Sequence, residues 1–546
     1  MPEIRGLIFK MHLTRIYIDG FKRLTQFDLN LNEKLNVIVG DNETGKTSVL
    51  EAINLVLTCQ YDGRNINYAL DPYLFNIEWV TKYFATLRRG ELTSPPEILI
   101  EAYFNNDKED PELGRLTGTH AHEHVEGAGL ILQIRPDHKY TDELKEYVND
   151  TSNPEVIPVE YYTVQWISFK GEIITSRSAP IRSKLIDTSI GRAYHSPNKY
   201  LAQILKDDLE PEDRQALSLA YRKLRHEFSK GDGLKSLNEK LQQRNKAGTG
   251  KKLTVQMDLS SRTSWESAIT PHLDDLPFDC AGKGEQCRIQ MRVAIAGAAK
   301  SRVLLIEEPE NHLSHSNMNL LMTEIVEECD DQHQVIVVTH SAYVLNKLGI
   351  DNLRLISKAG KSLSLTGLDP TTAAYFMKLP GYDTLRLILS DKSILVEGPS
   401  DELIVQRAYK KKHGVLPLDN GIDVISVGTA FKRFLEIATR LKLTVHAVID
   451  NDGKVESLEA RYSEYINATN TGVQICYDKD GSCPTLEPQL RKVNQLETLN
   501  KILGKSETSK DRLNDYMKNY KTECALKFFE TEESWNVPEY IASAIQ

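Results

Sequence analysis

The chain has 546 residues, a formal net charge of −10 at pH 7 and 40% apolar residues. This length exceeds what one hydrophobic core usually organises, so we expect roughly three or four structural units. The acidic balance argues against a broadly basic nucleic-acid-binding coat, although it is compatible with a local basic groove. The seven cysteines are dispersed and form no C-x-x-C pair, which favours a reduced, cytoplasmic setting. We find neither a signal-peptide core nor a run of about 20 apolar residues, and expect no membrane association.

Two runs of alternating apolar and polar residues, 13–21 and 27–31, predict antiparallel strands near the start of the chain. Next comes the phosphate-binding pattern G-x-x-x-x-G-K-[ST] at residues 40–47. An apolar run precedes it and a helical spacing follows it, which is the strand, glycine loop and helix order that phosphate binding requires. The glycines let the backbone wrap a phosphate, and the helix N-terminus supplies free amides. The residues predicted to bind the nucleotide here are Gly40, Asn42, Gly45, Lys46, Thr47 and Ser48, with Thr47 also on Mg²⁺.

The middle of the chain changes character twice. Strand-like runs at 97–104 and 159–166 are separated by polar loops, and we interpret the histidine-rich segment 120–124 as a flexible surface loop rather than a metal site. From about residue 179 to 259, apolar residues recur at helical intervals within polar sequence, which predicts a helical insertion. This insertion could pack against a second copy of the chain or could form a purely structural lid, and the sequence leaves both uses open.

Three later elements could complete the nucleotide site. The glycine-rich segment 282–286 precedes a helix and, through Gly284, is suited to receive a γ-phosphate. The apolar strand 303–306 ends in Glu307 and Glu308, where one carboxylate can hold Mg²⁺ and the next can polarise the attacking water. A third buried strand, 335–338, delivers His340 to where it could contact the γ-phosphate.

These elements resemble the ATP-binding-cassette (ABC) ATPases, specifically the recombination-type and SMC-like ATPases. The resemblance implies that Lys46 and Thr47 bind phosphate and Mg²⁺, Glu307 is the Walker B acid, Glu308 is the catalytic base and His340 is the switch histidine. It also implies that hydrolysis needs two heads facing each other. Two departures are visible: Glu307 replaces the commoner Asp, and residues 282–286 are a loose version of the signature loop.

A second strand-and-helix unit begins after residue 380. Apolar strands at 392–396, 422–427 and 445–449 alternate with helical segments, which predicts a parallel sheet with functional residues at the carboxyl ends of its strands. Four carboxylates follow these strands: Glu397, Asp401, Asp450 and Asp452. Converging carboxylates repel one another unless they hold cations, so the pattern predicts an Mg²⁺ or Mn²⁺ site, against the alternative of separate turn and cap acids.

The pattern E-G-x-x-D followed by D-x-D resembles the Toprim domain of topoisomerases, primases and certain nucleases. An ABC-type head followed by Toprim is similar to the OLD (overcoming lysogenization defect) family of ATP-dependent endonucleases. By that resemblance Glu397, Asp450 and Asp452 bind one metal ion, and Asp401 and Glu487 help to hold a second. Lys521 is then the late lysine that stabilises the phosphorane charge. The implied chemistry is two-metal, in-line cleavage of a phosphodiester.

The sequence therefore predicts an α/β protein: an ABC-type ATPase head (1–178 and 260–380), a helical insertion (179–259) and a C-terminal Toprim domain (381–546). We expect a cytoplasmic, homodimeric or larger ATPase that cuts DNA with ATP and Mg²⁺ or Mn²⁺. The family resemblance implies a role in anti-phage defence, beside a partner such as a helicase or a retron reverse transcriptase with its RNA and DNA. Two alternatives remain: a Toprim strand-passing enzyme, and an ATP-gated DNA-binding or DNA-organising protein with a non-cleaving Toprim domain.

Overall fold

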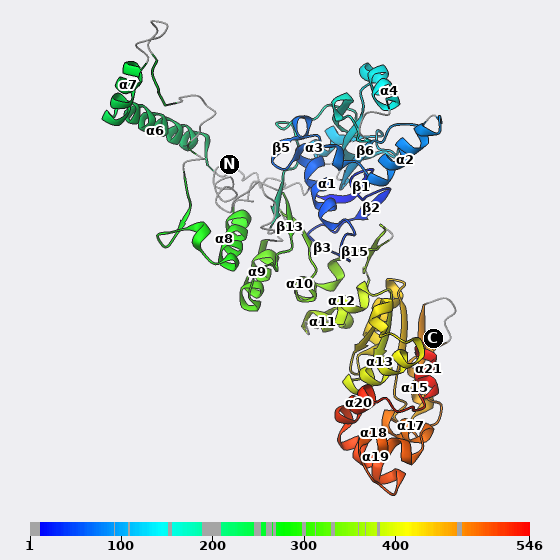
Figure 1. The fold of residues 1–546 in the computed structure, drawn as a ribbon. Coiled ribbons are helices and arrows are strands. Elements are labelled where there is room, and N and C mark those ends of the chain that lie inside the picture. Colours follow the sequence, from blue (N-terminus) through cyan, green and yellow to red (C-terminus); the bar gives the residue numbers. More distant parts are fainter. Residues whose placement is uncertain are drawn as a thin grey trace, which may run out of the picture. The chain divides into compact units, whose positions relative to one another are not determined.

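A computed structural model gives the fold (Figure 1). It describes residues 11–91, 93–106, 110–150, 155–187, 209–244, 253–257, 265, 269–296, 302–311, 313–328, 333–358, 360–365, 367–378, 383–466 and 472–546. The chain forms two compact units, one of Met1–Lys22, Asn30–Leu35 and Thr47–Val338, the other of Arg23–Leu29, Asn36–Lys46 and Thr339–Gln546. Among the described residues, no helix combines the length and the apolar character needed to cross a bilayer.

The first unit contains an antiparallel sheet. Strand β1 (Leu13–Asp19) pairs with β6 (Ile98–Phe104), which pairs with β8 (Gly127–Pro136). Strand β8 also pairs with β9 (Tyr162–Ser168) and with the short β7 (Thr117–Gly118). The strand predicted at 97–104 is confirmed, and that at 159–166 is confirmed from Tyr162 onward.

The histidine-rich segment 120–124 is anchored to this sheet, so the prediction of a flexible loop is wrong. Glu101 lies in β6 with only 1% of its surface exposed, and its Oε1 accepts a hydrogen bond from the backbone N–H of His122 at 2.8 Å. The other oxygen, Oε2, lies 2.7 Å from His122 Nδ1 and accepts from the Tyr103 hydroxyl at 2.7 Å. The His122 ring stacks on Tyr17 with 3.9 Å between centroids. A buried carboxylate needs such donors, and this requirement fixes the segment.

The same unit holds three parallel strands, β10 (Ser183–Asp187), β13 (Val303–Glu307) and β14 (Gln334–Val338). Every residue of β13 and β14 is buried, which explains their continuous apolar sequence. Strand β10 falls inside the predicted helical insertion and corrects its start. Its partner β13 lies more than 100 positions later, so local periodicity could not reveal the pairing.

Helices form the later part of the predicted insertion. α6 (Pro211–Lys230) and α7 (Asp232–Arg244) pack against each other. Residues 188–208, 245–252, 258–264 and 266–268 of this region lie outside the described part of the chain. Helix α8 (Lys283–Ala296) confirms the helix predicted after the glycine-rich segment 282–286, and the end of that prediction, 297–299, again lies outside the described residues.

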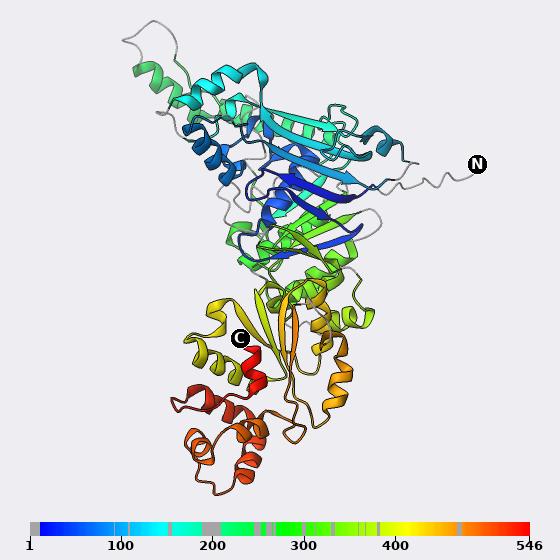
Figure 2. The same cartoon turned by 90° about the vertical axis from the view of Figure 1, so that its right-hand side faces the viewer.

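In the second unit, β3 (Leu35–Gly40) pairs in parallel with β15 (Leu353–Ile356), and β15 pairs antiparallel with β16 (Ser362–Ser364). A separate sheet follows, with the parallel strand order β18-β17-β19-β20. Its strands are β17 (Lys392–Val396), β18 (Ile422–Ser426), β19 (Thr444–Val448) and β20 (Val473–Cys476). The predicted parallel sheet is confirmed, and helices lie on both sides of its strands (Figure 2).

One hydrophobic cluster joins this sheet to the C-terminal helices. It includes Ile394 of β17, Ile404 of α13, Leu503 of α18 and Phe528 of α20, all less than 1% exposed. Helices α17 to α20 gather at one end of the sheet (Figure 1). The cluster therefore makes the helical C-terminus part of the same rigid core as the strands.

The remaining elements complete the two units. In the first unit they are β4 (Gln60–Tyr61), β5 (Arg64–Asn65), α2 (Ile77–Arg88), α3 (Pro111–Leu116), α4 (Thr141–Asn149), β11 (His272–Leu273), β12 (Leu276–Pro277) and α9 (His315–Glu328). In the second unit they are α10 (Ala342–Leu348), α11 (Pro370–Lys378), α12 (Asp383–Leu389), α13 (Pro399–His413), α14 (Phe431–Arg440), α15 (Val455–Arg461), α16 (Ser463–Ile466), α17 (Leu486–Val493), α18 (Leu496–Leu503), α19 (Lys510–Asn519), α20 (Lys521–Glu530) and α21 (Glu539–Ala544). Strand β2 (Phe27–Asn30) and helix α1 (Lys46–Thr58) contain residues of both units.

Candidate functional site

The phosphate-binding pattern folds as the sequence predicts. Helix α1 begins at Lys46, directly after the loop, so its free amides lie at the end of the glycine segment. Gly45 has φ +95, and a Cβ there would lie 2.9 Å from Leu24 Cδ2; a Cβ at Gly40 would lie 2.8 Å from the carbonyl oxygen of Ile356. The Lys46 ammonium is buried and donates to the carbonyls of Gly40 (3.0 Å) and Asp41 (2.6 Å). Glycine at these two positions and a lysine folded over the loop fit a bound phosphate.

The carboxylates that end β13 also occupy the predicted places. Glu307 is 7% exposed, and its Oε1 accepts a short hydrogen bond from the Thr47 hydroxyl. The predicted Mg²⁺ pair is thus brought together. Glu308 has φ +45, donates its backbone N–H to Val338 at the end of β14 (2.8 Å), and accepts from Asn311 Nδ2 at its Oε2 (2.8 Å).

Four other residues were predicted to contact the nucleotide, and none of them takes part in the hydrogen bonds described above. Asn42 is exposed, Ser48 is half-buried on α1 and Gly284 lies in the first turn of α8. His340 is exposed and follows β14, next to Thr339, whose hydroxyl accepts from the backbone N–H of Ser341. The roles of these four residues therefore stay predictions.

The predicted metal-binding acids collect at the carboxyl edge of the second sheet. Strands β17 and β19 are parallel neighbours, with Leu395 opposite Ala447, so Glu397 and Asp450 follow strand ends on the same edge. Asp401 lies in the first turn of α13, and its Oδ2 accepts from the backbone N–H of Gly398 at 3.1 Å. Glu487, 4% exposed in the first turn of α17, accepts from the Thr485 hydroxyl at 2.7 Å.

Burial and mutual repulsion raise the pKa values of three of these acids, Glu397, Asp401 and Asp450. Burial first, then the charges of Asp401, Glu397 and Glu487, raise the pKa of Asp450 to about 8. Burial raises the pKa of Asp401 to about 6, with Glu397 and Glu487 adding to the rise and the Gly398 N–H opposing it. The pKa of Glu397 is raised by burial and then by Asp452. The acids therefore act as one electrostatic group.

Lys521 is the cation that faces this group. Its Nζ lies 3.5 Å from Glu487 Oε1, and its charge lowers the pKa values of both Glu397 and Asp450. Within the described residues, no three His, Cys, Asp or Glu side chains converge closely enough to enclose a metal ion. The structure thus gathers the predicted residues at one edge, and their assignment as ligands stays a prediction.

Three supporting residues escaped the sequence analysis. Asn451, buried between Asp450 and Asp452, donates its amide to the carbonyls of Asp478 (2.8 Å) and Asp480 (3.1 Å) and accepts from the Gly453 N–H. Thr485 orients Glu487, as described above. Tyr540 of α21 is buried; its pKa is raised far above the usual range by burial and then by Asp450 and Asp401. Of these three residues, only Asn451 could have been predicted from the sequence, because an Asn side chain in a short turn often forms hydrogen bonds with the backbone.

Lys358 links the phosphate loop to the second sheet. It lies in the turn between β15 and β16, and its Nζ is 2.9 Å from Asp391 Oδ1 and 3.6 Å from Asp41 Oδ2. Asp41 belongs to the phosphate loop, while Asp391 directly precedes β17, the strand that ends at Glu397. The pairing with Asp391, then Asp41, raises the pKa of Lys358, so the lysine stays charged.

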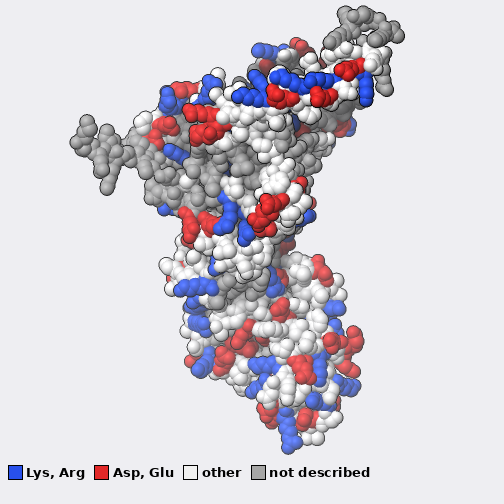
Figure 3. Space-filling model, turned by 90° about the vertical axis from the view of Figure 1, so that its left-hand side faces the viewer, with Lys and Arg blue, Asp and Glu red and all other residues white. Residues whose placement is uncertain are grey.

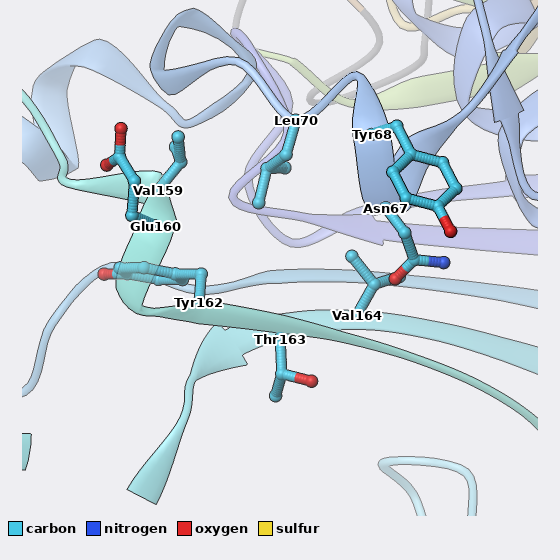
Figure 4. Close-up of a pocket in the computed structure, with 8 residues that line it drawn as sticks. All are labelled: Asn67, Tyr68, Leu70, Val159, Glu160, Tyr162, Thr163 and Val164. Atoms are coloured by element: carbon cyan, nitrogen blue, oxygen red, sulfur yellow. The ribbon is translucent and has the colours of Figure 1, made fainter. Parts of the chain in front are cut away.

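A surface hollow of about 330 Å³ lies in the first unit, away from these residues in the sequence. Figure 4 shows that Asn67, Tyr68 and Leu70 face the segment 159–164 across it. Glu160 is the one ionisable carboxylate in its lining, and the hollow includes none of the predicted site residues.

Family models decide what this arrangement belongs to. Residues 35–346, more than half of the chain, match the model described as an AAA domain, putative AbiEii toxin, Type IV TA system. Residues 388–452 match the overcoming lysogenization defect protein-like TOPRIM domain. The chain is an AAA-domain ATPase of the OLD family. Its fold class, an ABC-type head followed by Toprim, is thereby confirmed.

Similarity of the OLD-family chain to individual proteins is short or distant. It is 49% identical over 43 residues to the DNA replication and repair protein RecF of Shewanella loihica, and 51% identical over 43 residues to that of Glaesserella parasuis. Each alignment covers 8% of this chain and only 12% of the relative. A solved SMC head bound to the C-terminal winged-helix domain of ScpA is 17% identical, with a TM-score of 0.33 over 65% of this chain and 98% of that one. The assignment of the OLD-family fold rests on the two family models.

The raised pKa of Asp450 predicts a pH-dependent stability in EDTA. Because its pKa is about 8 in the folded state and near 3.8 when exposed, the folded protein binds the extra proton between these values. The free energy of unfolding therefore falls as pH rises from about 4 to about 8. Asp450→Asn cannot ionise, so we expect its melting temperature to exceed that of the wild type by roughly 5 °C at pH 8 and to approach it near pH 4. Thermal unfolding across this pH range tests the prediction, and equal melting temperatures throughout would contradict it.

Proposed function

We propose that this OLD-family protein is an ATP-dependent, divalent-metal-dependent DNA endonuclease. The observation that carries the proposal is the group of mutually repelling carboxylates at the Toprim edge, of which Glu487 is buried and Asp401 and Asp450 are half-buried, faced by Lys521. Carboxylate oxygens are the ligands that Mg²⁺ and Mn²⁺ prefer, and burial without a cation disfavours their charged form. The donor chemistry therefore suits Mg²⁺ or Mn²⁺, and because no three such side chains among the described residues converge on one point, a bound ion would have to draw them together.

The proposed roles follow the sequence prediction. Glu397, Asp450 and Asp452 hold one metal ion, and Asp401 and Glu487 contribute to a second. When bound, such ions supply charge stabilisation and water activation for phosphodiester hydrolysis. Lys521, half exposed beside Glu487, places a positive charge where a phosphate would carry developing negative charge.

The ATPase domain supplies the second half of the proposal. The loop Gly40–Lys46 fits a nucleotide phosphate, Thr47 and Glu307 fit Mg²⁺, and Glu308 is the proposed base that orients water. Gly284 and His340 are proposed to contact the γ-phosphate, and Asn42 and Ser48 to complete the loop. ATP binding and hydrolysis then govern assembly or access to the Toprim site.

A second copy of the chain is the proposed partner. Helix α6 exposes Leu219 (57%), Leu224 (66%) and Phe228 (63%), although an isolated soluble helix tends to hide such side chains. Its first turn carries Glu212 and Asp213 and its last turn Lys230. Two copies packed antiparallel would place acidic and basic ends together, as a two-fold interface requires.

DNA is the proposed substrate, and local lysines rather than a broad basic surface would contact it. On the face shown in Figure 3, acidic and basic side chains are mixed over the C-terminal part of the chain. The cysteines among the described residues are all free, in keeping with the proposed cytoplasmic location. A defence role beside a helicase or a retron reverse transcriptase is proposed from family resemblance alone.

The first prediction concerns ATP. Lys46→Ala removes the cation from the phosphate loop, so ATP binding measured by calorimetry should be lost. Glu308→Gln keeps the loop but removes the base, so the variant should bind ATP, hydrolyse it about 100-fold more slowly and sediment as a dimer. Lys82→Ala, a lysine exposed on α2, is the control. Unchanged ATP affinity in Lys46→Ala would refute the loop's role, and normal turnover in Glu308→Gln would move the base elsewhere.

The second prediction concerns cleavage. Supercoiled plasmid with Mg²⁺ or Mn²⁺, with and without ATP, should yield nicked and linear products with the wild type. Asp450→Ala removes a central carboxylate and should lower the rate about 100-fold or more, whereas Glu532→Ala, which changes an exposed acid of the same domain, should cut normally. Equal cleavage by Asp450→Ala would favour the non-cleaving, DNA-binding alternative. Covalent protein–DNA adducts after denaturation would favour strand passage.

The third prediction concerns communication between ATP and cleavage. Lys358→Ala removes the pairs to Asp41 and Asp391, so ATP hydrolysis should persist while the ratio of cleavage rates with and without ATP moves toward one. Exposed pairs contribute up to about 1 kcal/mol, so a change of roughly two- to fivefold is expected. Lys361→Ala removes an exposed lysine after the same turn and should leave the ratio unchanged. A ratio equal to that of the wild type in Lys358→Ala would exclude this route.

A further inference from the structure

Two tyrosines form an aromatic platform where α19 meets α20. The Tyr516 and Tyr520 rings lie 4.8 Å apart between centroids with 33° between their planes. Lys505 Nζ lies 4.1 Å from the centroid of the Tyr516 ring. Tyr516 is half-buried and packs against the core cluster, whereas Tyr520 is 51% exposed. One ring is therefore fixed, and the second presents a face to solvent.

This platform adjoins Lys521, the lysine that faces the Toprim acids. Tyr520 directly precedes Lys521, so their Cα atoms lie about 3.8 Å apart. The Lys521 ammonium in turn reaches within 3.5 Å of Glu487, which repels the charges of Glu397 and Asp450. A strand whose phosphate lies beside Lys521 would have a neighbouring nucleotide at Tyr520.

We propose that Tyr520, backed by Tyr516 and Lys505, stacks on an unpaired base next to the phosphate to be cut. A base inside a duplex has both faces covered by its neighbours, so a tyrosine can stack only on a base that has left the stack. The substrate class is therefore single-stranded or locally unpaired DNA. This inference deepens the proposed nuclease function and rests on it.

Charges around the platform suit a nucleic-acid strand. Exposed Lys518 precedes Tyr520 by two positions and Lys521 follows it, so this part of the chain carries positive charge that phosphates can meet. The nearby acid Glu523 is compensated: its Oε1 accepts from the Tyr516 hydroxyl at 3.4 Å and lies 3.4 Å from Lys527 Nζ.

A structural role alone explains only half of the arrangement. Tyr516 and Tyr520 are four positions apart, and a pair with this spacing stabilises a helix end. That accounts for Tyr516, which the core holds. It gives no reason for the outer ring, which directly precedes Lys521, to expose half of its surface, where a smaller polar residue would fit.

The test compares cleavage of one oligonucleotide as a single strand and as a blunt duplex, in Mg²⁺ or Mn²⁺ with ATP, using the full chain. Tyr520→Ala should lower kcat/KM on the single strand about 5- to 100-fold, since base stacking is lost, and change the duplex rate less than about twofold. Tyr520→Phe keeps the ring and should retain single-strand cleavage. Leu526→Ala, which truncates an exposed leucine of the same helix, should match the wild type.

Two results would overturn the proposal. One is single-strand cleavage by Tyr520→Ala equal to that of the wild type, or an equal loss on both substrates. The other is a loss in Tyr520→Phe as large as in Tyr520→Ala, because that would assign the role to the hydroxyl.

A binding measurement separates this inference from the nuclease proposal. In the Asp450→Ala background, a single strand containing 2-aminopurine should lose fluorescence on binding, because the probe stacks on Tyr520. Adding Tyr520→Ala should restore the fluorescence, and quenching that persists would overturn the proposal. If the wild type cuts neither DNA while the quenching depends on Tyr520, the nuclease function fails and the stacking platform stands.

Discussion

The constraint on which the C-terminal domain depends is the repulsion among carboxylates held at one edge of a parallel sheet. Glu397 and Asp450 follow neighbouring strands, and the sheet register fixes them on the same side. Loss of part of their hydration and the charges of the neighbouring acids push each toward its protonated form. Holding these acids together concentrates negative charge at this edge of the sheet. Lys521 compensates part of that charge, and a bound cation would compensate the rest.

The rest of the domain keeps that group in place. Asn451 holds the D-x-D turn by donating hydrogen bonds to the carbonyls of Asp478 and Asp480. Within that turn the backbone of Asp452 has a positive φ of +49. Tyr540 of α21 is buried close enough to the acids for Asp450 and Asp401 to raise its pKa. The hydrophobic cluster that joins the strands to α18 and α20 holds the helix bearing Lys521 against the sheet. Position at this edge is therefore set by packing and not by the acids themselves, which would separate if free to move.

Local sequence was sufficient to place the candidate acids that follow a strand directly. Glu307, Glu397 and Asp450 each come at the end of a buried apolar run, and the glycine loop is contiguous, so pattern and chemistry coincide. Prediction failed where a role depends on a distant partner. Strand β10 needs β13, His122 needs the buried carboxylate of Glu101, and Lys358 needs acids more than 30 positions away on either side. Charge runs and histidine clusters look alike in sequence whether solvated or paired, because pairing is a property of the fold.

The phosphate loop and the Toprim sheet belong to one compact unit, which matters for how ATP could act on cleavage. The exposed Lys358, placed between Asp41 and Asp391, is a contact between them that the structure shows. A buried ion pair in that position would cost several kcal/mol to break and would hold the two parts in a single state. Exposed pairs contribute up to about 1 kcal/mol, a size that phosphate contacts at the loop can readily outweigh. A link this weak suits a connection that ATP binding could make or release. Because Asp391 directly precedes β17, a movement of Lys358 would shift the strand that Glu397 follows.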